Sequence, residues 1–171
     1  MTPVPEPHYV TSLEEVVWGG TLIAITMVMH GFGMLLVLRV TGILKHRHEA
    51  KPSFFKGMFT LILASWMILV VHLTEVFSWA FFFLQNQAVD AKHVNASLCY
   101  YFALLDYTTL GCPYNLILRW RLLEGMIAMA GLLTFAWSTG VLLTLAQDFQ
   151  DQQLKLLKDR HERRHAGPKP G

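Results

Sequence analysis

Residues 57–84 read GMFTLILASWMILVVHLTEVFSWAFFFL, and the only titratable side chains in this run are those of His72 and Glu75. A helix that crosses a bilayer needs about 20 predominantly apolar residues, so this run is long enough to span a membrane. Residues 16–38, before it, and residues 125–146, after it, are also long enough and contain no Lys, Arg, Asp or Glu. The sequence therefore predicts three membrane-spanning helices.

The overall composition agrees with this prediction. Of the 171 residues, 53% are apolar and 15% are charged, and the mean hydropathy is +0.38. Soluble domains carry about 25% charged residues. A net charge of +2 does not indicate a nucleic-acid partner, so the lipid bilayer is the expected surroundings. We do not expect an enzyme, because no nucleotide or nucleophile motif is present and no extramembrane segment is large enough to hold a substrate pocket.

A shorter apolar segment lies between the second and third spans. It covers residues 98–110 and is interrupted by Asp106. Because it is too short to cross the bilayer, we expect a re-entrant or interfacial helix. Non-helical backbone at membrane depth is tolerated only where protein or a water-filled cavity surrounds it.

The start of the first helix carries a local signal. Ser12-Leu13-Glu14-Glu15 matches a capping box, in which the hydroxyl and the carboxylate each accept a backbone N–H of the other residue. We therefore expect the helix to begin directly after Ser12.

Basic residues are distributed unevenly between the connections. Eleven of the 14 Lys and Arg residues lie in residues 39–56 and 147–171, whereas residues 1–15 contain none and residues 85–124 contain three. The positive-inside rule then places the amino terminus outside and the carboxyl terminus in the cytoplasm. We expect an outer tail over residues 1–15, a membrane domain over residues 16–146 and a basic cytoplasmic tail over residues 147–171.

The turn that follows the short segment, Thr108-Thr109-Leu110-Gly111, has the composition of an ion-binding loop. Ion filters can be built from inward-pointing backbone carbonyls contributed by several identical loops. Threonine supplies hydroxyl and carbonyl oxygens, and glycine allows backbone conformations that keep successive carbonyls facing the ion. One loop cannot surround an ion, so such a filter requires several chains, here four.

Residues 100–111, YYFALLDYTTLG, resemble the pore helix and filter entrance of potassium channels. The chain most resembles small bacterial ion-channel proteins of the two-transmembrane pore superfamily that carry an additional leading helix. The resemblance continues through residues 120–124 and 131–139, extends weakly into residues 72–75 and 79–80, and covers a pore-like module over residues 57–146. It implies an all-α membrane protein with three transmembrane helices plus a re-entrant pore helix and a filter-like loop, assembled as a homotetramer in the bacterial inner membrane.

The resemblance assigns roles within the loop and then breaks. Thr108 opens the motif, Thr109 would supply hydroxyl and carbonyl oxygens at the inner end of the filter, and Leu110 and Gly111 would supply the next carbonyls. The family usually continues with Tyr-Gly-Asp, whereas this chain has Cys112-Pro113-Tyr114. Proline fixes φ near −65° and cannot adopt the positive φ that glycine supplies. We expect the inner carbonyls to be retained and the outer ones lost, which would weaken or abolish selectivity.

Other residues of the module have two interpretations each. Gly131 is either a hinge of the inner helix or a site of close helix packing. Thr134 and Ser138 lie four residues apart on one helical face and either line an inner cavity or bond to carbonyls of their own helix. Asp106 either places negative charge beside the ion path or bonds behind the filter to Trp120 or Arg121, and we favour the second.

His72 and Glu75 lie one turn apart in the second span, and His30 of the first span is their expected partner. Ionisable residues in membrane segments are rare and indicate a function by default. Imidazole and carboxylate could bind zinc, iron or copper, and two histidines could bracket a haem. We favour a hydrogen-bonded cluster that fixes helix packing, so we expect no metal or haem cofactor. The filter-like turn leaves open a bound monovalent cation.

Together these patterns predict a passive cation channel whose potassium-channel-like filter is degenerate. The alternative is a non-conducting accessory subunit that packs against other membrane subunits and reuses the channel fold. A metal- or haem-binding membrane subunit is a third possibility.

Overall fold

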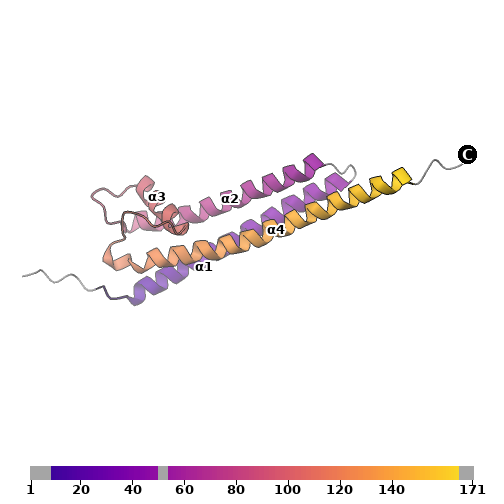
Figure 1. Ribbon diagram of the computed structural model, residues 1–171. Coiled ribbons are helices and arrows are strands. Elements are labelled where there is room, and N and C mark those ends of the chain that lie inside the picture. Colours follow the sequence, from indigo (N-terminus) through magenta and orange to yellow (C-terminus); the bar gives the residue numbers. More distant parts are fainter. Residues whose placement is uncertain (1–8, 50–53, 166–171) are drawn as a thin grey trace, which may run out of the picture. The chain divides into compact units, whose positions relative to one another are not determined.

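The computed structural model describes residues 9–49 and 54–165 (Figure 1). These residues form four α-helices, α1 (Leu13–Glu49), α2 (Phe54–Gln85), α3 (Ala96–Tyr107) and α4 (Leu122–His165), with a short 3-10 helix, η1 (Leu118–Trp120), before α4. Residues 1–8 of the expected outer tail and residues 166–171 of the expected cytoplasmic tail lie outside the described part. The prediction of an all-α chain is confirmed for the residues described.

Three of the helices are long and apolar enough to cross a membrane, as the sequence predicts. The candidate spans are Leu13–His46, Phe54–Gln85 and Leu118–Lys158. The chain therefore has the composition of a multi-pass membrane protein. The helix α4 continues through Gln147 and beyond because Gln, Leu, Lys and Arg, which favour helix, predominate after the apolar run.

The capping box at the start of α1 is confirmed. The Glu15 amide donates to the Ser12 hydroxyl at 3.1 Å, and the Ser12 amide donates to the Glu15 carboxylate at 3.0 Å. The same carboxylate also accepts the amide of Leu122, the first residue of α4, at 3.1 Å. Glu15 is buried, and it therefore fixes the start of α1 to the start of α4.

The chain divides into two compact units. The first comprises the described residues up to His30 together with residues 72–135, and it contains α3, which lies beside the last turns of α2 in Figure 1. Its core is aromatic: the rings of Phe83 and Phe102 meet edge to face at 5.5 Å, and Trp79 is fully buried. Aromatic pairs in this geometry hold α3 against α2.

Asn95 begins α3 by accepting the amide of Leu98 at 2.9 Å, which is an N-cap. The chain on either side of α3 is also joined by backbone hydrogen bonds, from Ile117 to Ala88 and from Asp90 to Asn115, each 2.8 Å long. The short helix is therefore fixed at both ends.

The second unit comprises residues 31–49, 54–71 and 136–165 of the described chain and has a small aliphatic core. Met34 and Val37 of α1 pack with Ala64 and Ile68 of α2. Gly33 allows close packing, because a Cβ at that position would meet the side chain of Val71.

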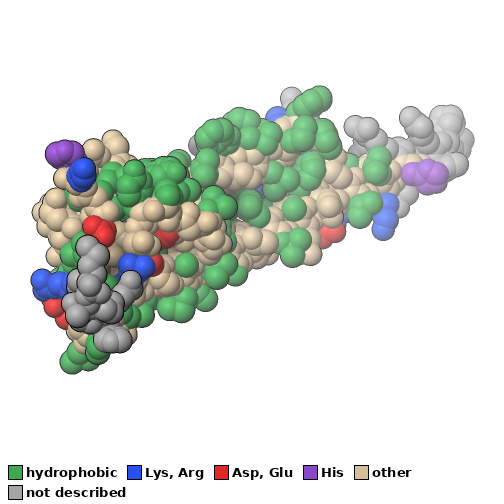
Figure 2. All heavy atoms as spheres, turned by 60° about the vertical axis from the view of Figure 1, so that its left-hand side comes forward, with side chains coloured by type: hydrophobic (Ala, Val, Ile, Leu, Met, Phe, Trp, Pro, Cys, Tyr) green, Lys and Arg blue, Asp and Glu red, His purple; other side chains and the backbone are tan. Residues whose placement is uncertain are grey.

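Large hydrophobic side chains remain exposed along all three long helices. In α1, Phe32 is 71% exposed, and in α2, Phe55 is 77% exposed. Figure 2 shows hydrophobic side chains over much of the face drawn. Extensive exposed apolar surface marks contact with lipid or with other protein.

Candidate functional site

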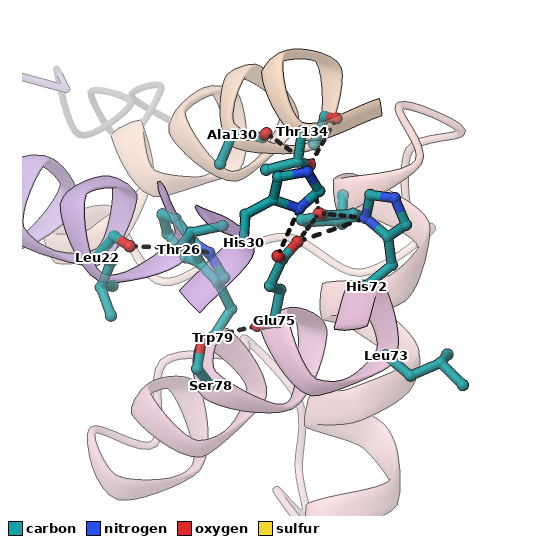
Figure 3. A network of polar contacts seen from close by, with 12 residues as sticks. Leu22, Thr26, His30, His72, Leu73, Glu75, Ser78, Trp79, Ala130 and Thr134 are labelled. Atoms are coloured by element: carbon teal, nitrogen blue, oxygen red, sulfur yellow. Dashed lines mark hydrogen bonds and ion pairs between the residues drawn. The ribbon is translucent and has the colours of Figure 1, made fainter. Parts of the chain in front are cut away.

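Side chains from α1, α2, α3 and α4 meet around one buried carboxylate, that of Glu75 (Figure 3). His30 of α1 lies with its Nδ1 atom 2.9 Å from Oε1 of Glu75 in α2. The Tyr107 hydroxyl, at the end of α3, donates to Oε2 of Glu75. The Nδ1 atom of His72, also in α2, lies 3.0 Å from that hydroxyl. Thr134 of α4 completes the set, with its Oγ1 atom 2.5 Å from the same hydroxyl.

These five residues, which we call the Glu75 network, are almost completely shielded from solvent. His30, Glu75 and Thr134 are 0% exposed, Tyr107 is 1% exposed and His72 is 6% exposed. Burial and the hydrogen bond to Glu75 raise the pKa of Tyr107, so its phenol remains a hydrogen-bond donor. Buried polar groups of this kind are stable only when they have partners, and here each helix supplies a partner to the others.

The structure brings His30 together with His72 and Glu75, the three residues that the sequence singled out in the first two spans. Sequence reasoning missed Tyr107 as their partner. The signal was present, because a tyrosine directly precedes the Thr-Thr-Leu-Gly turn, but its distance from Glu75 along the chain conceals the contact.

A second buried polar contact lies nearby. The Trp79 indole donates to the Thr26 hydroxyl at 2.9 Å, and this hydroxyl donates to the Leu22 carbonyl of its own helix at 2.8 Å. The contact between Trp79 and Thr26 joins α2 to α1 a little more than one turn before His30. Nothing in the sequence distinguishes Thr26 from the other hydroxyl residues of the spans.

The structure favours one interpretation of each inner-helix residue. A Cβ at Gly131 would collide with the carbonyl oxygen of Tyr107, so Gly131 is a site of close packing between α4 and the end of α3. Thr134 is buried within the Glu75 network and also bonds to the carbonyls of Ala130 and Gly131. In the single chain, Thr134 therefore bonds to carbonyls of its own helix, which is the second of the two interpretations. Ser138, one turn further along α4, is also buried, at 4% exposed.

The loop after α3 begins with a Schellman motif. The Leu110 amide donates to the Leu105 carbonyl at 2.9 Å, and the Thr109 amide donates to the Asp106 carbonyl at 3.0 Å. This motif requires a left-handed residue, and Thr109 supplies it with φ of +62°. The helix therefore ends at Tyr107, three residues earlier than the apolar pattern predicts. A β-branched residue in this region is strained by about 1–3 kcal/mol, which is typical of functional loops.

The next residues leave their carbonyl groups open. Thr109, Leu110 and Gly111 are exposed, Leu110 by 76%, and Gly111 has φ of +74°. Among the hydrogen bonds of residues 9–49 and 54–165, the carbonyl oxygens of these three residues accept none. Cys112 is partly buried and Pro113 is exposed.

Asp106 lies behind this loop, where it is 7% exposed. Burial and the negative charge of Glu124 raise the pKa of Asp106 to about 6, against an opposing backbone hydrogen bond from Cys112. The expected bond to Trp120 or Arg121 is replaced by this bond to Cys112. Glu124 lies in reach because it accepts the Leu116 amide at 2.6 Å, which holds the returning chain beside α3.

Comparisons of this chain with protein-family models, with curated proteins and with solved structures found no match. The interpretation of the site therefore depends on its own geometry.

The contribution of the Tyr107 hydroxyl to stability can be tested with Tyr107→Phe, which keeps the ring and removes the hydroxyl. We expect a loss of about 1–3 kcal/mol in the free energy of unfolding, because a buried carboxylate oxygen loses its donor. Tyr101→Phe on the same helix, where the side chain is 48% exposed, is the control and should change stability little. Unfolding by denaturant in detergent micelles measures both. An equal effect of the two variants would contradict the network.

The raised pKa of Asp106 predicts that the free energy of unfolding depends on pH. Its pKa is raised from 3.8 to about 6 in the folded state, so the folded chain holds the proton more tightly. This contribution to stability is complete below about pH 4 and is lost as the pH rises towards 6 and beyond, by up to about 3 kcal/mol. We expect Asp106→Asn to become more stable relative to the wild type as the pH rises from 4 to 7. A constant difference over that range would contradict the assignment.

Proposed function

We propose that this chain forms a passive cation pore from four copies, with the backbone carbonyls of Thr109, Leu110 and Gly111 arranged around a shared axis. In this proposal α3 is the re-entrant pore helix, and a monovalent cation is the ligand of the loop. The protein would belong to the potassium-channel-like pore superfamily and lie in the bacterial inner membrane, with its amino terminus outside.

The depth of the loop supports this proposal. Tyr107, one residue before the loop, contacts Glu75, which lies ten residues inside the end of α2 at Gln85. It also contacts Thr134, twelve residues after the start of α4 at Leu122. At 1.5 Å per residue, these contacts lie about 15 Å and about 18 Å along the spanning helices. The hydrocarbon core is about 30 Å thick, so the loop would begin close to the middle of the membrane.

The single observation that carries the proposal is the set of open carbonyls in the loop, which the proposal places at that depth. Exposed backbone carbonyls in lipid cost several kcal/mol each, so irregular backbone occurs there only beside protein or water. Other copies of the loop and a hydrated cation would together satisfy these groups. Carbonyl dipoles aimed at one axis replace the hydration shell of a cation.

The exposed apolar surface near the loop supports assembly. Leu110 in the loop and Met129, Leu132 and Leu133 in α4 are each more than half exposed. Leu110 projects from an irregular turn at the proposed depth, where neighbouring copies could cover it. This surface would be the contact between chains.

The strained turn indicates which part of the filter would function. Positive φ at Thr109 and Gly111 turns the backbone as a carbonyl loop requires, but Pro113 lacks a backbone N–H and cannot continue that conformation. A filter with only its inner carbonyls would bind few ions at once. We therefore expect weak preference for potassium over sodium.

Purified chain reconstituted in liposomes provides the test. We expect potassium and sodium flux through the wild type, with little preference between them. Leu110→Lys should reduce the flux by at least about tenfold, because a fixed positive charge beside the axis repels cations by 1.4 kcal/mol or more, about a factor of ten. Leu118→Lys, at a leucine 45% exposed in η1, is the matched control and should conduct.

Absence of flux from folded, tetrameric wild type would contradict conduction. Recovery of a single copy bound to foreign membrane subunits would favour the accessory-subunit alternative. Strong potassium selectivity would contradict the effect assigned to Pro113.

A further inference from the structure

The Glu75 network contains a set of metal-ligating atoms from two helices. His30, His72 and Glu75 each offer one ligand atom, and these atoms all lie within 4.8 Å of one another. The nearest nitrogen–oxygen pairs are 2.9 Å apart for His30 and Glu75 and 3.4 Å apart for His72 and Glu75. Ligands bound tetrahedrally to zinc at about 2.0–2.1 Å are about 3.3 Å apart, so one small ion could contact all three groups after a small adjustment.

The charge of Glu75 requires a positive partner. Its side chain is 0% exposed, and an uncompensated carboxylate in such surroundings costs several kcal/mol. Among the residues that the structure describes, the ion pairs of Glu75 are those with His30 and His72, and neither Lys nor Arg pairs with it. A proton, on an imidazole or on the carboxyl group itself, or a bound cation would neutralise this charge.

The type of ligand selects the type of cation. Two imidazoles and one carboxylate suit first-row transition metals, whereas Ca²⁺ and Mg²⁺ prefer sites made entirely of oxygen. The two imidazole rings lie 5.3 Å apart between their centroids, which leaves no space for a porphyrin between them. A single ion therefore fits this cluster better than a haem does.

The neighbouring residues have the arrangement that supports metal ligands. The Tyr107 hydroxyl donates to Oε2 of Glu75, which leaves Oε1 as the ligand oxygen beside Nδ1 of His30. An ion bound to Nδ1 of His72 would replace the present contact between that nitrogen and the Tyr107 hydroxyl. Thr134 in turn contacts Tyr107. Hydrogen-bonded partners of this kind orient ligating side chains.

We propose that His30, His72 and Glu75 form a binding site for one divalent first-row transition metal ion, with Tyr107 as a positioning residue. The ion would join α1 to α2 and, through Tyr107, would fix the end of α3. This site does not depend on whether the loop conducts ions.

The test uses the full chain, purified in detergent, stripped with EDTA, exposed to zinc chloride and freed from unbound metal. Elemental analysis should find about one zinc per chain. His30→Gln and Glu75→Gln should each weaken zinc binding by at least about tenfold, because each removes one of three ligands. His93→Gln, at an exposed histidine between α2 and α3, is the matched control and should retain the metal.

X-ray absorption of the zinc-loaded wild type provides a measurement that does not depend on how the variants fold. We expect a shell of nitrogen and oxygen ligands at about 2.0–2.1 Å that includes two imidazoles. Sulfur in the shell at about 2.3 Å would overturn the proposal, since it would identify a cysteine site. Wild type that retains no zinc would also overturn it. Loss of zinc from His93→Gln equal to that from Glu75→Gln would overturn it as well.

Discussion

The hydrogen bond between the Tyr107 hydroxyl and the Glu75 carboxylate connects the short helix to the long ones. Glu75 is buried in α2, and Tyr107 is the last residue of α3. A carboxylate in this position is stable only while its oxygens accept hydrogen bonds or bind a cation. The requirement to satisfy Glu75 therefore fixes where α3 ends, and with it the position of the turn that follows.

This hydrogen bond also constrains α4 and the loop that follows α3. Gly131 lets the backbone of α4 approach the Tyr107 carbonyl, and Thr134 reaches the Tyr107 hydroxyl from the next turn. On the other side, the Schellman motif places Thr109 in a left-handed conformation. Strain at Thr109 is tolerated because α3 is capped at Asn95 and held in the aromatic core. The hydrogen-bonded end of α3 thus holds residues 109–111 in an exposed position.

Much of the fold follows from the sequence because the relevant forces are local. Long apolar runs predict the three spans, and Ser12 with Glu15 predicts the start of α1, since each signal lies within a few turns of the residues it affects. The end of α3 is predicted less well, because a β-branched Thr109 conceals a left-handed cap that glycine would have announced.

The residues of the candidate site are also only partly predictable from the sequence. Rare ionisable residues in the spans identify His30, His72 and Glu75, because such residues are costly in a membrane. The contribution of Tyr107 depends on the tertiary position of α3, which no short-range pattern encodes. The same is true of Thr26 and Trp79, whose contact links two helices across 53 residues of sequence.

The position of residues 109–111 decides whether the chain can form a pore, and a map of the purified protein in a lipid nanodisc by electron cryomicroscopy shows that position directly. We expect four chains around one axis, with α3 within the membrane and the carbonyl oxygens of Thr109 and Leu110 facing that axis. A map in which this loop lies at the membrane surface, or faces lipid around a chain with no central path, would contradict the account.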